Sequence, residues 1–91
     1  MKYFAVILSM KDEEKSRIHR PEHLAYLDQR RKEGKVIAHG RFADGAGGLI
    51  IYRAESLEEA TQYAQEDPYV KLGARDYKVH EWEMVSDYLT V

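Results

Sequence analysis

The run of six apolar residues from Tyr3 to Leu8 limits the fold of this chain more than any other feature of its sequence. Six residues rich in aromatic and branched side chains are too few for a buried helix and are typical of a β-strand. Both alternating faces of the run are apolar, and such a strand belongs in the middle of a sheet that is covered on both sides. The chain therefore has to build a sheet with this run near its centre.

Three further segments have the composition of strands. Residues 36–42 form one, which Gly40 interrupts, and residues 49–52 form another that is apolar on both faces. Residues 77–84 carry polar side chains on both faces, as expected of a strand at the edge of a sheet. Between the second and third strands, residues 43–48 contain the Asp-Gly and Gly-Gly pairs that are typical of a hairpin turn.

A helix is expected between the first and second strands. Residues 11–17 are charged and lack apolar periodicity, so we expect a solvated loop there. The helix should begin around Pro21, because a first helical turn tolerates the missing N–H of proline. It should end at Glu33, since Gly34 can adopt the left-handed conformation that follows many helices.

A second helix is expected between the third and fourth strands. Ser56 and Glu59 have the spacing of a capping box, which predicts a helix start. Pro68 disfavours helical conformation at Asp67, so the helix should end there. The element order is therefore βαββαβ, the split βαβ or ferredoxin-like motif of α+β proteins.

This motif predicts a four-stranded antiparallel sheet whose first and third strands are central, which agrees with the two segments that are apolar on both faces. Two helices cover only one face of such a sheet, so the other face has to be buried in another way. We expect a second copy of the sheet to cover it in a homodimer. With 91 residues, the chain has room for a single domain, residues 1–91.

Composition narrows the class of function. The 91 residues include no cysteine, which excludes disulfides, Cys-ligated metal sites and a thiolate nucleophile. A net charge of -2 with both signs interspersed gives no reason to expect nucleic acid as a partner. The longest apolar run is far shorter than the ~20 residues of a membrane span, so we expect no membrane partner and a soluble, cytoplasmic protein.

Two residues are a candidate functional pair. Asp67 continues the helical stripe of Ala60, Tyr63 and Ala64, so its carboxylate should point inward at a helix C-terminus, where negative charge is disfavoured. Such a carboxylate needs a donor, which a histidine, an arginine or backbone amides can supply. His23 lies at the inner margin of the first helix near its expected start, and antiparallel helices bring that point close to the end of the second. The alternative is two unrelated polar residues with separate partners.

Three stretches of the sequence resemble the YCII-related family. They are Arg-Pro-Glu-His-Leu-Ala-Tyr-Leu at 20–27, Glu-Gly-Lys at 33–35 followed by Gly40, and Asp-Pro-Tyr-Val at 67–70 followed by Gly73. The resemblance spans nearly the whole chain in matching order. It implies a ferredoxin-like protomer, a dimer whose sheets pack into an α+β barrel, and an active site around a His–Asp pair, here His23 and Asp67. It also implies kinship of fold with muconolactone-isomerase-like and dehydrochlorinase enzymes.

Five other residues are candidates for substrate binding. Arg20 and Arg41 can anchor an anionic group through a bidentate guanidinium contact, or can be solvated and paired with nearby acids. Ser9, at the exit of the central strand, can bond a ligand or serve a turn. Gly40 is the small residue of the family-like stretch. Tyr69 can line a pocket, donate its hydroxyl, or simply pack.

Metal and phosphate sites have weaker support. His19 and His23 have the four-residue spacing of two metal ligands on a helix, but the expected helix start excludes His19 and no third ligand is evident. The glycines at 45, 47 and 48 do not match a phosphate-binding loop. We therefore predict no metal and no cofactor.

The first hypothesis is a small cofactor-free lyase or isomerase that acts on a small organic molecule, anionic or phenolic. His23 would be the general base and acid, because the ordinary pKa of histidine lies near neutral pH. Asp67 would orient the imidazole and stabilise its charged form. The alternative is a dimeric module that binds a metabolite without catalysis, and a cofactor-free monooxygenase on the same fold is a third reading.

Overall fold

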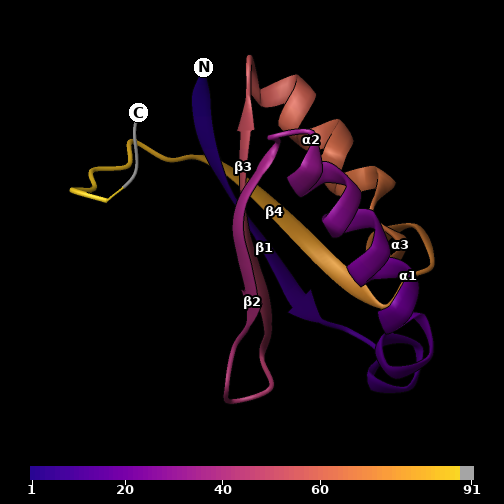
Figure 1. Ribbon diagram of the computed structural model, residues 1–91. Helices are drawn as coiled ribbons and strands as arrows, with labels where there is room; N and C mark the ends of the chain where they lie inside the picture. The colour runs from indigo at the N-terminus through magenta and orange to yellow at the C-terminus, as the bar shows by residue number, and fades with distance from the viewer. Residues whose placement is uncertain (89–91) are drawn as a thin grey trace.

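The computed structural model describes residues 1–88, which form one antiparallel sheet with helices on one face (Figure 1). The strand order is β2-β3-β1-β4, so β1 and β3 are central. This arrangement confirms the ferredoxin-like prediction. The elements in chain order are β1 (Lys2–Met10), α1 (Glu13–Lys32), β2 (Val36–Arg41), β3 (Gly47–Ala54), α2 (Leu57–Glu66), α3 (Pro68–Lys71) and β4 (Arg75–Glu81).

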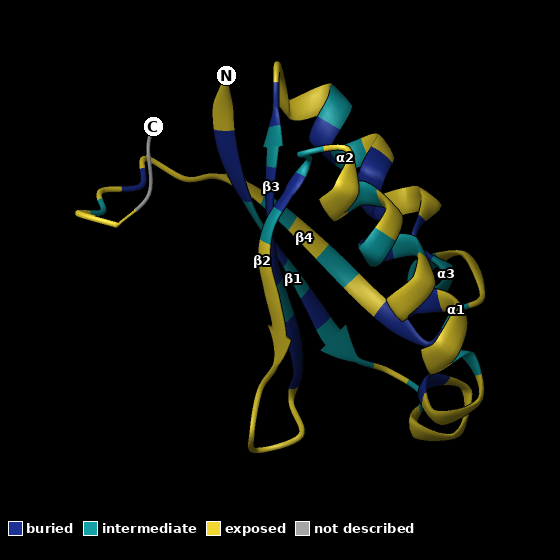
Figure 2. Cartoon of the chain, viewed as in Figure 1, coloured by how far each residue is buried: buried dark blue, intermediate teal, exposed yellow. Residues whose placement is uncertain are grey.

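Alternation along β1 divides the apolar residues between the two faces of the sheet. Phe4, Val6 and Leu8 point toward the helices and are at most 1 % exposed, because they pack in the main core with residues of β3, α1 and α2. Tyr3 and Ala5 lie on the opposite face. Figure 2 shows the buried residues gathered between sheet and helices, with exposed residues along most of β2. The edge position of β2 and β4 agrees with their more polar sequences.

Helix α1 begins earlier than the sequence pattern predicted. Residues 11–17 were expected to be a loop, but the helix starts at Glu13 and Asp12 is its N-cap, accepting a hydrogen bond from the Lys15 amide at 2.9 Å. Pro21 consequently lies inside the helix and not in its first turn. The start is set by capping and by acidic residues near the positive end of the helix dipole, neither of which needs apolar periodicity. The predicted end is confirmed, since Gly34 adopts φ +78° just after it.

The second helical segment follows the capping prediction at its start. The Ser56 hydroxyl accepts a hydrogen bond from the Glu59 amide at 3.1 Å. At the other end, Asp67 is extended (φ −62°, ψ 127°), and Pro68 opens the additional one-turn helix α3. The expectation of two helices is corrected by this short third one. Asp67 is therefore both the C-cap of α2 and the N-cap of α3.

The hairpin between β2 and β3 brings the backbone of β3 very close to β1. At Gly47 φ is +137°, and an added Cβ would lie 1.9 Å from the carbonyl oxygen of Leu8. Only glycine fits this position. Strand β3 extends past the predicted residues 49–52 at both ends, whereas β2 stops one residue before the predicted Phe42.

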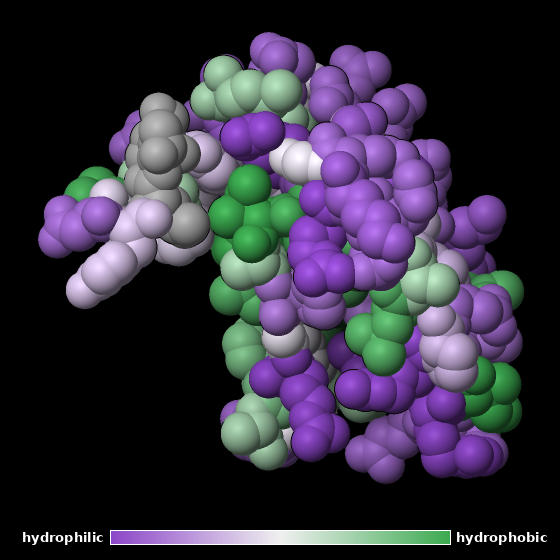
Figure 3. Space-filling model, viewed as in Figure 1, coloured by the Kyte–Doolittle hydropathy of each residue, from purple (hydrophilic) through white to green (hydrophobic). Residues whose placement is uncertain are grey.

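The helix-free face of the sheet is only partly covered by the chain itself. Strand β4 was expected over residues 77–84, but it ends at Glu81, and Met84 then folds onto Tyr3 and Ile51 on this face. Ala5, Ile7, Ile37 and Leu49 are other apolar residues of this face, and they are half-buried. Figure 3 shows apolar surface along the strand side of the molecule, whereas the helices present mainly hydrophilic atoms. Within residues 1–88, no helix combines the length and apolar character that crossing a membrane requires.

Candidate functional site

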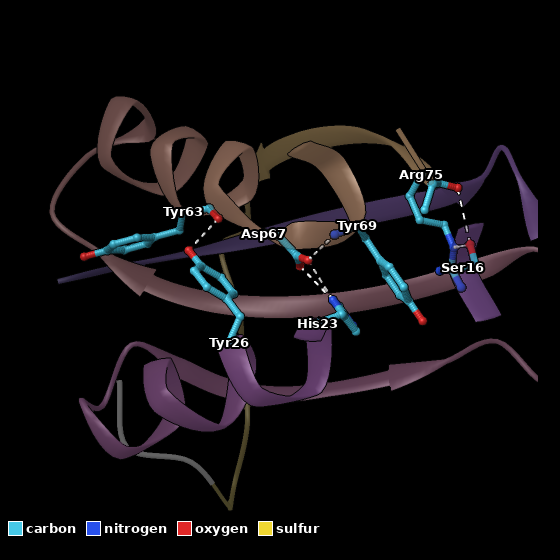
Figure 4. A network of polar contacts seen from close by, with 8 residues as sticks. Ser16, His23, Tyr26, Tyr63, Asp67, Tyr69 and Arg75 are labelled. Carbon is cyan, nitrogen blue, oxygen red and sulfur yellow. Dashed lines mark hydrogen bonds and ion pairs between the residues drawn. The ribbon is translucent and has the colours of Figure 1, made fainter. Parts of the chain in front are cut away.

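His23 and Asp67 form a buried pair between α1 and the junction of α2 with α3 (Figure 4). The imidazole Nδ1 lies 2.7 Å from Asp67 Oδ1 and 3.0 Å from Oδ2. Asp67 is fully buried and His23 is 8 % exposed. His23 lies near the middle of α1, not near its start as predicted, because the helix begins at Glu13. The two elements nevertheless meet, since α1 packs against α3.

The contacts of Asp67 fix the orientation of the imidazole. Asp67 Oδ1 also accepts a hydrogen bond from the Tyr69 amide at 2.9 Å. An ionised carboxylate can only accept, so Nδ1 of His23 carries the hydrogen of the pair. The other ring nitrogen, Nε2, has no hydrogen-bond partner among residues 1–88, and His23 lines a cavity. When the imidazole is neutral, Nε2 therefore carries the lone pair of a ring that lines this cavity.

Tyr69 connects this pair to a second polar cluster. Its ring stacks on the His23 imidazole with centroids 3.8 Å apart and planes inclined by 13°. The Arg75 guanidinium carbon lies 4.4 Å from the centre of the same ring. Figure 4 shows the phenol ring between the imidazole and Arg75. Arg75 Nε donates to the Ser16 hydroxyl at 3.0 Å, so the stack is held at both ends by hydrogen bonds.

The cavity beside His23 has a volume of about 170 Å³ and is lined by residues of α1, α3 and all four strands. Its charged lining is cationic, from Arg20, Arg41 and Arg75, and no Asp or Glu among the described residues lines it. A second hollow of about 340 Å³ shares these three arginines and adds Arg17 and Glu13. A space with this lining favours an anionic guest.

Four of the five residues proposed for substrate binding line the cavity, namely Arg20, Gly40, Arg41 and Tyr69. Ser9 lies elsewhere, because it shares the helix-free face with the other odd-numbered residues of β1. The sequence analysis missed Arg75, which it placed before the fourth strand, and His39, which also lines the cavity. Arg75 has no local sequence signal for this role, because its contacts come from Ser16 and Tyr69.

Tyr26 and His39 are among the groups near the pair that have shifted pKa values. Burial raises the pKa of the Tyr26 phenol well above its usual range, and the nearby Glu66 acts in the same direction. Tyr26 therefore stays protonated and donates to the Tyr63 carbonyl at 2.7 Å. Partial burial lowers the pKa of His39, and neighbouring His23 also favours its neutral form.

The histidines do not converge on a metal site. His19 lies inside α1, contrary to the prediction, but its Nδ1 is 3.2 Å from the Glu22 carboxylate while His23 is bonded to Asp67. Within the described chain, no group of three or more His, Cys, Asp or Glu residues is arranged to hold a metal ion.

Comparisons with known proteins agree with this architecture. The family model of the YCII-related domain matches residues 1–83. The uncharacterized protein YjpA of Bacillus subtilis (strain 168) is 32% identical over 82 residues, which cover 90% of this chain and 96% of that protein. Among solved structures, 5-chloro-2-hydroxyhydroquinone dehydrochlorinase from Burkholderia phenoliruptrix AC1100, in complex with 2,5-dihydroxybenzoquinone, has a TM-score of 0.76 at 22% identity. The likeness covers 89% of this chain and 93% of that one.

Proposed function

This chain belongs to the YCII-related domain family, and from that premise we propose that it is a lyase or isomerase that moves a proton on a small anionic or phenolic molecule. The observation that carries the proposal is the buried contact of His23 Nδ1 with Asp67, 2.7 Å long, which leaves Nε2 without a hydrogen-bond partner among residues 1–88 on a residue that lines a cavity with cationic side chains. His23 is the general base and acid, and Asp67 holds it in place.

The proposed reaction begins when Nε2 accepts a proton from an acidified C–H or O–H of the substrate. The electron pair left behind enters a double bond, and either a leaving group departs with its own pair or the proton returns to another atom. The first course is an elimination and the second an isomerisation. Asp67 stabilises the imidazolium that forms in between, because the carboxylate already bonds the opposite nitrogen. Such a base accelerates proton transfer by roughly 10²–10⁴-fold, and the reaction as proposed needs no cofactor.

The cationic lining supports an anionic or phenolic substrate. Proton removal leaves negative charge on the substrate, and the guanidinium groups of Arg20, Arg41 and Arg75 stand where they can stabilise it. The dehydrochlorinase that shares the fold is named for the loss of HCl from a hydroxylated, chlorinated ring. Loss of HCl is an elimination of the proposed kind, so hydroquinones and aromatic acids are the first substrates to test.

The test is a panel of small hydroquinones, lactones and aromatic acids, screened by thermal shift and then for turnover. A ligand at 100 times its dissociation constant stabilises the folded state by about 2.7 kcal/mol, which such a screen detects. Turnover of a hit should disappear in His23→Gln and persist in His19→Gln. His19 is a matched control, because it lies on the same helix but does not line the cavity.

An active His23→Gln protein would remove the general-base assignment. Saturable binding without turnover by the unaltered protein would instead favour a dimeric module that binds a metabolite and catalyses nothing.

We also propose that the chain forms a homodimer through the helix-free face of its sheet. Ala5, Ile37 and Leu49 remain half-buried there, and Met84 covers only the end near Tyr3. Contiguous apolar surface of this kind typically marks a contact with another protein surface. A second copy of the same sheet supplies an equally apolar cover, which is the simplest closed assembly.

A further inference from the structure

We propose that the buried guanidinium of Arg75 is an anion-binding subsite, and that the ligand carries a carboxylate which it holds across Tyr69 from His23. The inference rests on the proposed function for the placing of the reactive group at His23. It goes further by naming the ligand group and the residue that recognises it.

Arg75 is an unusual arginine because it is buried without a counter-ion. It is 8 % exposed, and among residues 1–88 no Asp or Glu forms an ion pair with it. A guanidinium has five N–H donors, and the one hydrogen bond that the Arg75 guanidinium makes within the described chain uses Nε. Its terminal nitrogens belong to a side chain that lines both hollows. A buried charge is costly unless something pairs with it, and a bound anion would do so.

The side chain of Arg75 is held in one orientation before any ligand arrives. Its Nε donates to the Ser16 hydroxyl at 3.0 Å, and that hydroxyl in turn lies 3.3 Å from the carbonyl oxygen of Ala74, to which it donates. The guanidinium carbon also lies 4.4 Å from the centre of the Tyr69 ring. With Nε bonded to Ser16, the terminal N–H groups remain as a planar fork, which matches the two oxygens of a carboxylate.

The stack of His23, Tyr69 and Arg75 sets the distance between the carboxylate of the ligand and the imidazole of His23. His23 and Arg75 contact Tyr69 at 3.8 Å and 4.4 Å, and the ring lies between them in Figure 4. A ligand that reaches both groups must therefore span the ring of Tyr69, as a substituted benzoate can. Arg20 and Arg41 line the same cavity but are exposed, so their charges are already solvated and they attract anions without fixing them.

The experiment compares benzoate with benzamide, which has the same shape without the charge. Each is titrated into the full-length protein and followed by ¹⁵N NMR, including the Arg75 Nε–H resonance. We expect benzoate to bind at least tenfold more tightly than benzamide and to shift that resonance. Arg75→Gln should abolish the preference, whereas Arg31→Gln should keep it. Arg31 is a matched control, since it is exposed, pairs with Asp28 and lies outside the cavity.

The proposal would be overturned if benzoate and benzamide bound with equal affinity, or if benzoate showed no saturable binding. It would also be overturned if the preference for benzoate were kept in Arg75→Gln but lost in Arg20→Gln or Arg41→Gln. If Arg75→Gln does not fold, Ser16→Ala provides the second variant. It frees Nε while keeping the charge, so benzoate affinity should fall severalfold, and unchanged affinity would count against the subsite. This experiment measures binding and not turnover. If the protein prefers benzoate but shows no turnover that depends on His23, the proposed function is wrong while the proposed Arg75 subsite stands.

Discussion

Replacing Asp67 with Asn should change which nitrogen of His23 carries the hydrogen. Asp67 Oδ1 accepts from both His23 Nδ1, at 2.7 Å, and the Tyr69 amide, at 2.9 Å, while Oδ2 lies 3.0 Å from Nδ1. In the Asp67→Asn variant the side-chain oxygen can keep the Tyr69 bond, but an NH₂ group then takes the place of Oδ2. If Nδ1 kept its hydrogen, it could still donate to the retained oxygen, but the amide NH₂ donor would stand beside it at the place of Oδ2, 3.0 Å away. The imidazole avoids this by moving its hydrogen to Nε2, so that Nδ1 accepts from the amide.

The size of the effect follows from the burial of these groups. A hydrogen bond to a charged partner contributes about 1.5–3 kcal/mol and a neutral one about 0.5–1.5 kcal/mol, so Asp67→Asn should lower the free energy of unfolding by about 1–2 kcal/mol. Asp67→Ala leaves two buried donors without an acceptor, at about 1–3 kcal/mol each. The alanine variant should therefore lose about 2–6 kcal/mol, against a total of about 5–15 kcal/mol for a domain.

Urea denaturation measures the two losses, and ¹⁵N NMR of the histidine ring identifies the tautomer. With a substrate in hand, Asp67→Asn should lower kcat severely, since a comparable change behind a catalytic histidine in a serine protease costs ~10⁴-fold. The double variant Asp67→Asn with His23→Gln should have a kcat only slightly lower than that of the less active single variant, because the two residues act as a unit. The reasoning would be refuted if His23 kept its hydrogen on Nδ1 in Asp67→Asn. It would also be refuted if Asp67→Asn and Asp67→Ala had the same free energy of unfolding.

Three further predictions concern Tyr26, His39 and the helix-free face of the sheet. Tyr26→Phe removes the 2.7 Å bond to the Tyr63 carbonyl and should lower the free energy of unfolding by about 0.5–1.5 kcal/mol in urea; an unchanged value would contradict this. Because folding lowers the pKa of His39, protonation of His39 opposes folding as pH falls below about 6.5. Between pH 7.5 and pH 5.5, the free energy of unfolding measured by urea denaturation should therefore fall less in His39→Gln than in the unaltered protein. Equal decreases in the two proteins would contradict this. Ile7→Glu places a charge on the helix-free face and should give a folded monomer in sedimentation experiments. Val6→Glu places a charge in the fully buried core and should unfold the chain. If Ile7→Glu remains a dimer, the interface lies elsewhere.

The central strands could be predicted from the sequence because their cause is local. A strand with two apolar faces has one stable place in a sheet, and the pairing of β1 with β3 follows from that. The inward direction of Asp67 was also predicted from helical spacing, although Asp67 itself is extended and caps both α2 and α3. The start of α1 was missed because Asp12 and the acidic first turn act through capping and charge, whereas the analysis required apolar periodicity there.

The rest of the site depends on contacts between distant parts of the chain. Arg75 is positioned by Ser16, 59 residues earlier in the sequence, and by Tyr69 across a turn of chain. No pattern near Arg75 distinguishes it from a solvated residue at a strand end. The fold brings these side chains together only after the sheet and helices have packed.

Pro21 divides α1 into two hydrogen-bonded blocks. It lacks an amide hydrogen, so the carbonyl of Arg17 receives no helical bond from it, and the turns on either side are coupled more weakly than in an unbroken helix. Ser16 is the one buried residue of the first block, whereas His23 and the fully buried Leu27 anchor the second. Opening of the first block should therefore require little of the core to separate, and its amides should exchange with solvent sooner. His23 belongs to the second block, whose amides should exchange more slowly. The contact between His23 and Asp67 should therefore persist while the first block opens and closes.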